Sequence, residues 1–162
     1  MSAAMDFDLS KAIQYFQTVV TKHYSDFHGR VARRDFWTYA LVYLAVAVVV
    51  AIMQGLVGLG LLSLLELALL LPTAGMIARR LQDTGKNGSL VWFLMLPVLI
   101  SSAVSFVAAM IFGALAVVVI LFPLLWLLSL VSLIALIVLI YLCAQPGTPG
   151  SNAYGPPPAP AV

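Results

Sequence analysis

Long apolar tracts alternate with short polar segments along this chain. Apolar residues dominate positions 37–56, 59–78 and 89–142, and a polar segment at 79–88, predicted to be a loop, separates the second tract from the third. A transmembrane helix needs about 20 predominantly apolar residues. The first two tracts therefore predict membrane spans at about 37–56 and 59–78, joined by a tight turn that Gln54, Gly55, Gly58 and Gly60 supply.

The third tract carries no charged residue and is too long for a single span. Its 54 residues, Ser89 to Leu142, fit two long helices at about 90–112 and 116–142 with a connection near Gly113. Three spans would leave almost no residues for turns, although Pro97 and Pro123 could each break a helix. The pattern favours two spans in this tract and leaves three as the alternative.

Residues 8–24 show an amphipathic pattern. Their apolar residues recur every three or four positions: Leu9, Ile13, Phe16, Val20 and Tyr24. Polar residues fall largely opposite, and Asp8 or Ser10 can cap the first turn. The pattern predicts a short interfacial helix along the membrane surface, within an N-terminal segment at 1–26. A helix that binds a partner is the alternative interpretation.

The composition changes abruptly after Gln145. Gly and Pro dominate residues 146–162, together with Ser, Thr and Asn. These residues favour turns and polyproline-like conformations over helix. The pattern predicts a disordered, Pro-rich tail.

The overall composition indicates that lipid surrounds most of the chain. Of the 162 residues, 63% are hydrophobic and 9% are charged, with a mean hydropathy of +1.09. Soluble domains carry about 25% charged residues. We therefore expect an all-α integral membrane protein, a four-transmembrane-helix bundle within a membrane domain at 27–145.

Positive charge is confined to two segments. All eight Lys and Arg residues lie in the first 34 residues or between Arg79 and Lys86. Two predicted spans separate these segments, so the positive-inside rule places both in the cytoplasm. Two further spans would return the tail to the same side, which makes both termini cytoplasmic.

The polar segments on that side form a candidate cluster for binding. Arg–carboxylate pairs can lock the segments together, and excess Arg can bind anionic phospholipid headgroups. A small anionic molecule or a segment of a partner protein is the alternative ligand. The candidate residues are Arg30, Arg33, Arg34, Asp35, Arg79, Arg80, Asp83, Lys86, Asn152 and Tyr154.

Asp83 is the acid that we expect to hold this cluster together. The first two spans must run antiparallel, so the Arg residues before the first and at the end of the second share one membrane depth. Guanidinium groups so placed repel one another unless carboxylates or phosphates lie between them. We hypothesise that Asp83 is desolvated beneath the loop and pairs with them.

Glu66 is the one charged residue inside a predicted span. A helix beginning at 59 would place it about 10 Å from the turn. Ionisable groups at that depth are candidates for function, here transport together with the helix-breaking Pro72. The alternatives are a protonated Glu66, or one that reaches the water interface or Ser63.

Three motif segments together resemble the bacterial domain-of-unknown-function 805 inner-membrane family. They are Phe27-His28-Gly29-Arg30 through Arg33-Arg34-Asp35-Phe36-Trp37, then Leu71-Pro72 through Arg79-Arg80-Leu81-Gln82-Asp83-Thr84-Gly85-Lys86-Asn87-Gly88, then Pro146-Gly147-Thr148-Pro149-Gly150-Ser151-Asn152-Ala153-Tyr154-Gly155. The resemblance covers about 27–158 and implies a bacterial inner-membrane location. Gln82 stands where the family usually has His, which removes any metal or proton role for that His. Asn87 replaces the usual Ser, and Ser89-Leu90 replaces paired Trp.

The sequence offers little for catalysis. His23 and His28 are five residues apart and outside the spans, and 85–88 lacks the leading Gly and following Ser/Thr of a phosphate loop. We expect no enzyme activity, cofactor, metal or nucleic-acid partner, no internal disulfide with Cys143 alone, and no signal peptide. The expected function is structural or accessory, with a membrane-protein partner or a second copy as further candidates; a small transporter or channel component is the alternative.

Overall fold

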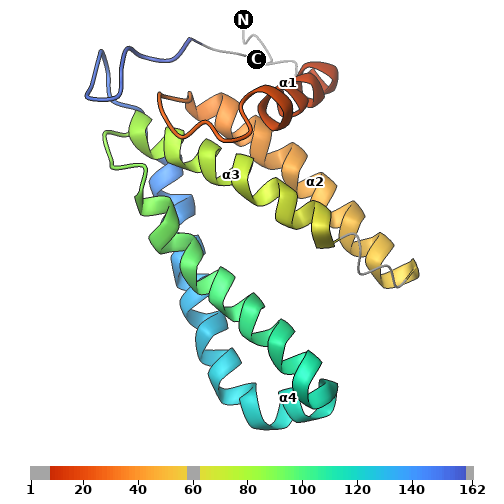
Figure 1. The fold of residues 1–162 in the computed structure, drawn as a ribbon. Helices are drawn as coiled ribbons and strands as arrows, with labels where there is room; N and C mark the ends of the chain where they lie inside the picture. The colour runs from red at the N-terminus through yellow and green to blue at the C-terminus, as the bar shows by residue number, and fades with distance from the viewer. Residues whose placement is uncertain (1–7, 58–62, 160–162) are drawn as a thin grey trace, which may run out of the picture. The chain divides into compact units, whose positions relative to one another are not determined.

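The structure, a computed structural model, describes residues 8–57 and 63–159. Its helices are α1 (Leu9–Lys22), α2 (Arg33–Val57), α3 (Ser63–Asp83) and α4 (Leu90–Ala144), and the described residues form no strand beyond one isolated bridge between Asn152 and Gly155 (Figure 1). The predicted all-α class is confirmed. The chain divides into two compact units, one of 1–88 with 146–162 and the other of 89–145.

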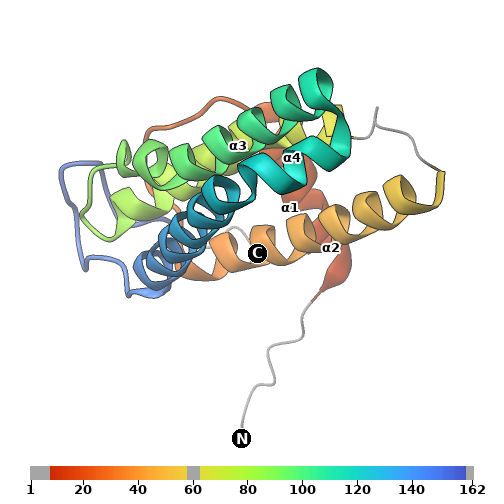
Figure 2. The ribbon, with the colours of Figure 1, turned by 90° about the horizontal axis from the view of Figure 1, so that it is seen from below.

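Helix α1 forms where the amphipathic pattern predicts a helix. Asp8 caps it, since its Oδ1 accepts hydrogen bonds from the backbone N–H groups of Ser10 (3.0 Å) and Lys11 (3.2 Å). The two views show α1 crossing α2 rather than running alongside it (Figures 1 and 2). Phe16 stacks on Tyr39 of α2 with ring centroids 5.2 Å apart, whereas Leu9 stays 60% exposed. The interfacial position of this helix stays a prediction.

Helices α2 and α3 lie side by side and antiparallel (Figure 1). The hydroxyl of Tyr39, in α2, lies 2.9 Å from Thr73 Oγ1, in α3. Tyr24, which follows α1, donates a hydrogen bond of 2.7 Å to the carbonyl of Ala68 in α3. Helix α2 continues through Gln54 and Gly55, so the prediction of a turn beginning there is wrong. The other residues of that turn, Gly58 and Gly60, lie outside the described residues.

Helix α3 extends further than the polar pattern suggests. Arg79, Arg80 and Asp83 lie in its last two turns, so the prediction of a loop is wrong for 79–83. Gly85, at φ +77°, ends the helix. Its backbone N–H donates to the carbonyl of Gln82, and the N–H of Lys86 donates to the carbonyl of Leu81. Apart from Thr73, every residue from 72 to 83 is buried.

The segment between α1 and α2 packs closely on α3. A Cβ atom added at Gly75 would lie 2.7 Å from the carbonyl oxygen of Asp26. That distance is shorter than real Cβ atoms tolerate, so the contact requires glycine. Gly75 thus allows the segment before α2 to reach the end of α3, where the charged residues lie.

Helix α4 forms the second unit. Helix is assigned without a break from Leu90 to Ala144, so it includes Gly113, and the division of this tract into two spans stays a prediction. The ribbon nevertheless reverses direction about midway, in the teal part, and its two arms run side by side (Figures 1 and 2). This unit therefore doubles back on itself, as two spans would.

Within the part of the chain that the structure describes, two segments are long and apolar enough to cross a membrane. They are Arg33–Leu56 and Pro123–Ala144, with mean hydropathies of 2.3 and 2.9 and only 22% and 11% of their most apolar stretches buried. Side chains such as Leu44 and Ile137 are exposed on them, as expected for surfaces that lipid covers. Helix α3 is not among these segments, and the four-span count stays a prediction.

Candidate functional site

A buried carboxylate lies at the centre of the polar residues of the first unit. Asp83, in the last turn of α3, is 3% exposed. Arg30 approaches its Oδ1 with both Nε and Nη2, each at 2.9 Å, and Arg80 Nη1 bonds its Oδ2. We call Arg30, Arg80 and Asp83 the arginine–aspartate cluster. It joins the segment before α2 to the end of α3.

Burial makes these ion pairs matter energetically. The Arg80 side chain is fully buried, and those of Arg30 and Asp83 are 2% and 4% exposed. Exposed ion pairs contribute about 0–1 kcal/mol, whereas removing one partner of a buried pair costs about 3–5 kcal/mol. The three groups therefore stabilise the structure only as a set.

Arg30 also binds the C-terminal tail through backbone carbonyls. Its Nη1 donates to the carbonyls of Gly150 (2.6 Å) and Gly155 (3.2 Å), and its Nη2 donates to that of Thr148 (2.7 Å). Thr148 in turn donates to the carbonyl of Asp83 through its N–H (2.8 Å) and its hydroxyl (3.1 Å). The prediction of a disordered tail is therefore wrong for this part of it.

Gln82 and Asn152 form a second connection among the same segments. Asn152 Nδ2 donates to the carbonyl of Gln82 and to Thr148 Oγ1, each at 2.9 Å, while its Oδ1 accepts from the N–H of Tyr154. The Gln82 side chain donates to the carbonyl of Phe27 at 2.9 Å. The residue at the usual His position thus has a structural role here.

Gly147 is part of the site because it has no side chain. A Cβ atom at this position would overlap the Asp83 carboxylate. Sequence reasoning missed Gly147 and Thr148, although both belong to the third motif segment. The spacing of the third motif segment was the signal that could have indicated these two residues. Hydrogen bonds to backbone carbonyls cannot be predicted from side-chain types, because every residue has a carbonyl.

The other predicted residues lie at different places. Arg79 pairs with Asp26 (3.6 Å), an acid that precedes α2. Arg33 and Arg34 are exposed at the start of α2, whereas Asp35 is buried there at 2% exposure. Lys86 follows the turn that ends α3, and Tyr154 joins the site through its backbone N–H rather than its ring.

Glu66 lies near the start of the described part of α3. That part begins at Ser63, and Glu66 is exposed within its first turn. The predicted start of this helix, at 59, lies outside the described residues, so the depth of Glu66 stays a prediction. An acid in the first turn of a helix is stabilised by the helix dipole, which gives Glu66 a structural explanation.

Comparison with known proteins gives a family and two relatives. A family model described as "Protein of unknown function (DUF805)" matches residues 24–156. The inner membrane protein YhaI of Escherichia coli (strain K12) is 35% identical over 86 residues, which cover 51% of this chain and 70% of that protein. YhaI of Escherichia coli O157:H7 gives the same figures. No solved structure matches the chain.

The first prediction concerns Asp83. Asp83→Asn keeps the shape of the side chain but leaves two buried guanidinium groups without their carboxylate. We expect it to lower the free energy of unfolding by about 3–5 kcal/mol, measured by thermal or denaturant unfolding in detergent. Asp6→Asn, the same chemical change outside the described residues, is the control. Equal, small effects of the two substitutions would show that the cluster contributes no more than a solvated pair.

Proposed function

Because this chain belongs to the DUF805 family of proteins of unknown function, and because its relative YhaI is an inner membrane protein, we propose a structural or accessory role in the bacterial inner membrane. In this proposal the chain crosses the membrane four times and keeps both termini in the cytoplasm. The first unit carries the cytoplasmic polar surface.

The arginine–aspartate cluster is the observation that carries this proposal. Its charged groups bond one another and the tail carbonyls, an arrangement that fixes segments in place rather than offering reactive groups to a substrate. Three segments far apart in sequence thereby become one polar surface. A fixed polar surface beside membrane helices suits an accessory protein that contacts lipid or another membrane protein, and we propose no enzymatic activity.

The four-span topology rests on charge and on the shape of each unit. Helix α2 satisfies the length and hydropathy of a span, and α3 returns antiparallel to it, so that the Arg residues before α2 and those ending α3 lie at the same end. The doubled-back α4 supplies an even number of crossings before the tail returns to this end. The positive-inside rule assigns that end to the cytoplasm.

Arg33 and Arg34 are the residues that we propose contact anionic phospholipid headgroups. Both are exposed in the first turn of α2, where the polar segment meets the apolar span. Arg30 and Arg80, by contrast, are buried in ion pairs. Of the ten residues predicted for the candidate cluster, we therefore assign lipid contact to Arg33 and Arg34.

Transport is the second candidate function, and Glu66 is its main support. The exposed position of Glu66 in the first turn of α3 favours the structural explanation. Helices α3 and α4 also continue through Pro72, Pro97 and Pro123, so the broken helices that a transporter would use are not seen at these residues. We therefore rank transport below the accessory role.

The second prediction tests lipid contact. The double substitution Arg33→Gln and Arg34→Gln should reduce the phosphatidylglycerol that copurifies in mild detergent, by about fivefold per residue, since a basic residue near an anionic surface contributes about 1 kcal/mol. Quantitative lipid mass spectrometry is the measurement, and Lys22→Gln in the exposed last turn of α1 is the control. The same preparations identify any copurifying protein. Unchanged lipid content in the double variant would refute the proposed contact.

The third prediction concerns topology. In a Cys143→Ala background, a single cysteine at Thr84 or at Ser151 should react with a membrane-impermeant maleimide only from the cytoplasmic side, and one at Gly58 only from the periplasmic side. Labelling of the Ser151 position from the periplasm would require an odd number of spans between it and Thr84.

The fourth prediction separates the two candidate functions. Proteoliposomes that contain the purified protein should stay impermeable to ions and small solutes, and Glu66→Gln should leave abundance and thermal stability unchanged, because Glu66 is exposed. A solute flux that Glu66→Gln abolishes would favour the transporter over the accessory role.

A further inference from the structure

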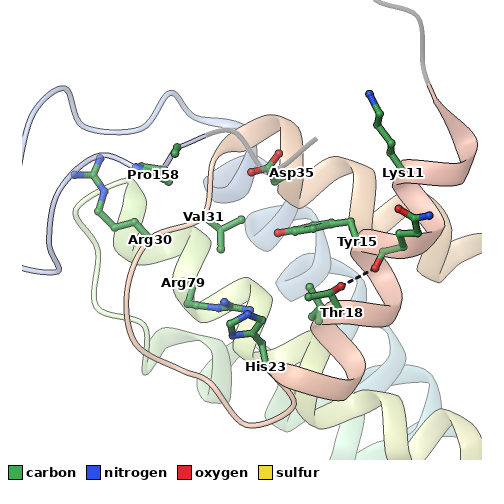
Figure 3. A pocket seen from close by; sticks show the side chains of 12 residues that line it. Lys11, Tyr15, Thr18, His23, Arg30, Val31, Asp35, Arg79 and Pro158 are labelled. Carbon is green, nitrogen blue, oxygen red and sulfur yellow. Dashed lines mark hydrogen bonds between the residues drawn. The ribbon is translucent and has the colours of Figure 1, made fainter.

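A polar pocket lies beside the arginine–aspartate cluster within the first unit. It encloses about 460 Å³ between α1, the segment that leads into α2, α3 and the tail (Figure 3). Ligand pockets commonly enclose about 300–1,000 Å³. The volume therefore suits a small ligand.

Positive charge predominates on the walls of this pocket. Lys11, Arg30 and Arg79 line it together with one carboxylate, that of Asp35, with His23 counted as neutral. The carboxylates that pair with these cations, those of Asp8, Asp83 and Asp26, lie outside the lining. Arg30 contributes charge only, because its donors already bond Asp83 and the tail. Lys11 lies at the rim, with its side chain 68% exposed.

Arg79 is the cation with donor capacity to spare. It is 8% exposed, its Nη1 lies 3.6 Å from a partly exposed Asp26 carboxylate, and its Nη2 donates to the sulfur of Met76. Its Nε is buried and has no hydrogen-bond partner among the described residues. A buried guanidinium with such weak partners gains most from an anionic acceptor.

Tyr15 supplies a neutral donor opposite Arg79. Burial is the main cause that raises its pKa to about 12, and the Asp35 charge raises it further while Arg79 opposes the shift. The phenol therefore keeps its proton at physiological pH. Figure 3 shows Tyr15 reaching into the pocket from α1 and Arg79 from the α3 side.

We propose that this pocket binds a small anionic ligand bearing a phosphate group. A tetrahedral phosphate presents acceptor oxygens in several directions, which matches donors that come from separate elements. Arg79 would pair with the phosphate, Tyr15 and Gln14 would donate hydrogen bonds, and Lys11 would approach from the rim. Thr18 is not assigned a role, since its hydroxyl already donates to the carbonyl of Gln14.

The pocket is distinct from the lipid contact of Arg33 and Arg34. Neither of those residues lines it, whereas Pro158 and Ala159 of the tail do. The cluster that holds the tail in place therefore also positions one wall of the pocket. The phosphate can belong to a free metabolite or to a lipid headgroup, and the experiment distinguishes these two sources.

The fifth prediction is a titration of the full chain with inorganic phosphate. In lipid-free detergent we expect saturable binding by isothermal titration calorimetry, together with a rise in unfolding temperature. Arg79→Gln should weaken binding by about tenfold or more and Tyr15→Phe by a few fold, as expected for lost charged and neutral hydrogen bonds. Lys22→Gln removes one positive charge outside the pocket, as Arg79→Gln does within it, and should leave the affinity unchanged.

A second arm repeats the titration in nanodiscs that contain phosphatidylglycerol. If inorganic phosphate binds in detergent but not in these nanodiscs, the lipid headgroup occupies the pocket. If phosphate binds with equal affinity in both, the pocket is assigned to a soluble phosphate compound. The absence of saturable binding in detergent would overturn the proposal. An equal effect of Lys22→Gln and Arg79→Gln would also overturn it, because attraction would then depend on overall charge. Tyr15→Phe keeps the test valid should Arg79→Gln fail to fold, since it removes one hydroxyl only.

Discussion

The first unit depends on the requirement that a buried charge be paired. Arg80 is fully buried at the end of α3, and Asp83 lies one turn further along the same helix. One carboxylate cannot satisfy all the donors of two guanidinium groups, so Arg30 uses tail carbonyls for the remainder. The positions of the segment before α2 and of the tail both follow from this one requirement.

Much of the architecture follows from the sequence because it depends on side-chain pattern. The apolar tracts predict the helical class, the period of residues 8–24 predicts α1, and Asp8 caps it as expected. The family match confirms the resemblance that three motif segments carry. The position of Asp83 between arginines from two segments also follows, since charge and the antiparallel arrangement of neighbouring spans restrict the alternatives.

The remaining features depend on interactions that sequence pattern does not encode. A run of charged residues predicts a loop when its partners are unknown, yet Arg79 to Asp83 continue α3 because pairing makes their burial favourable. The Gly- and Pro-rich tail predicts disorder, yet Arg30 holds it through backbone carbonyls, which every residue possesses.

The order of synthesis gives the tail a part in the maturation of this protein. Residues 148–155 follow α4 in the chain, so a ribosome makes them after every other part of the site, yet Arg30 and Asp83 both bond to them. In a nascent chain that stops before residue 148, the guanidinium group of Arg30 lacks the tail carbonyls that accept its hydrogen bonds. Synthesis of residues 148–155 is therefore the step that completes the bonding of this buried cation.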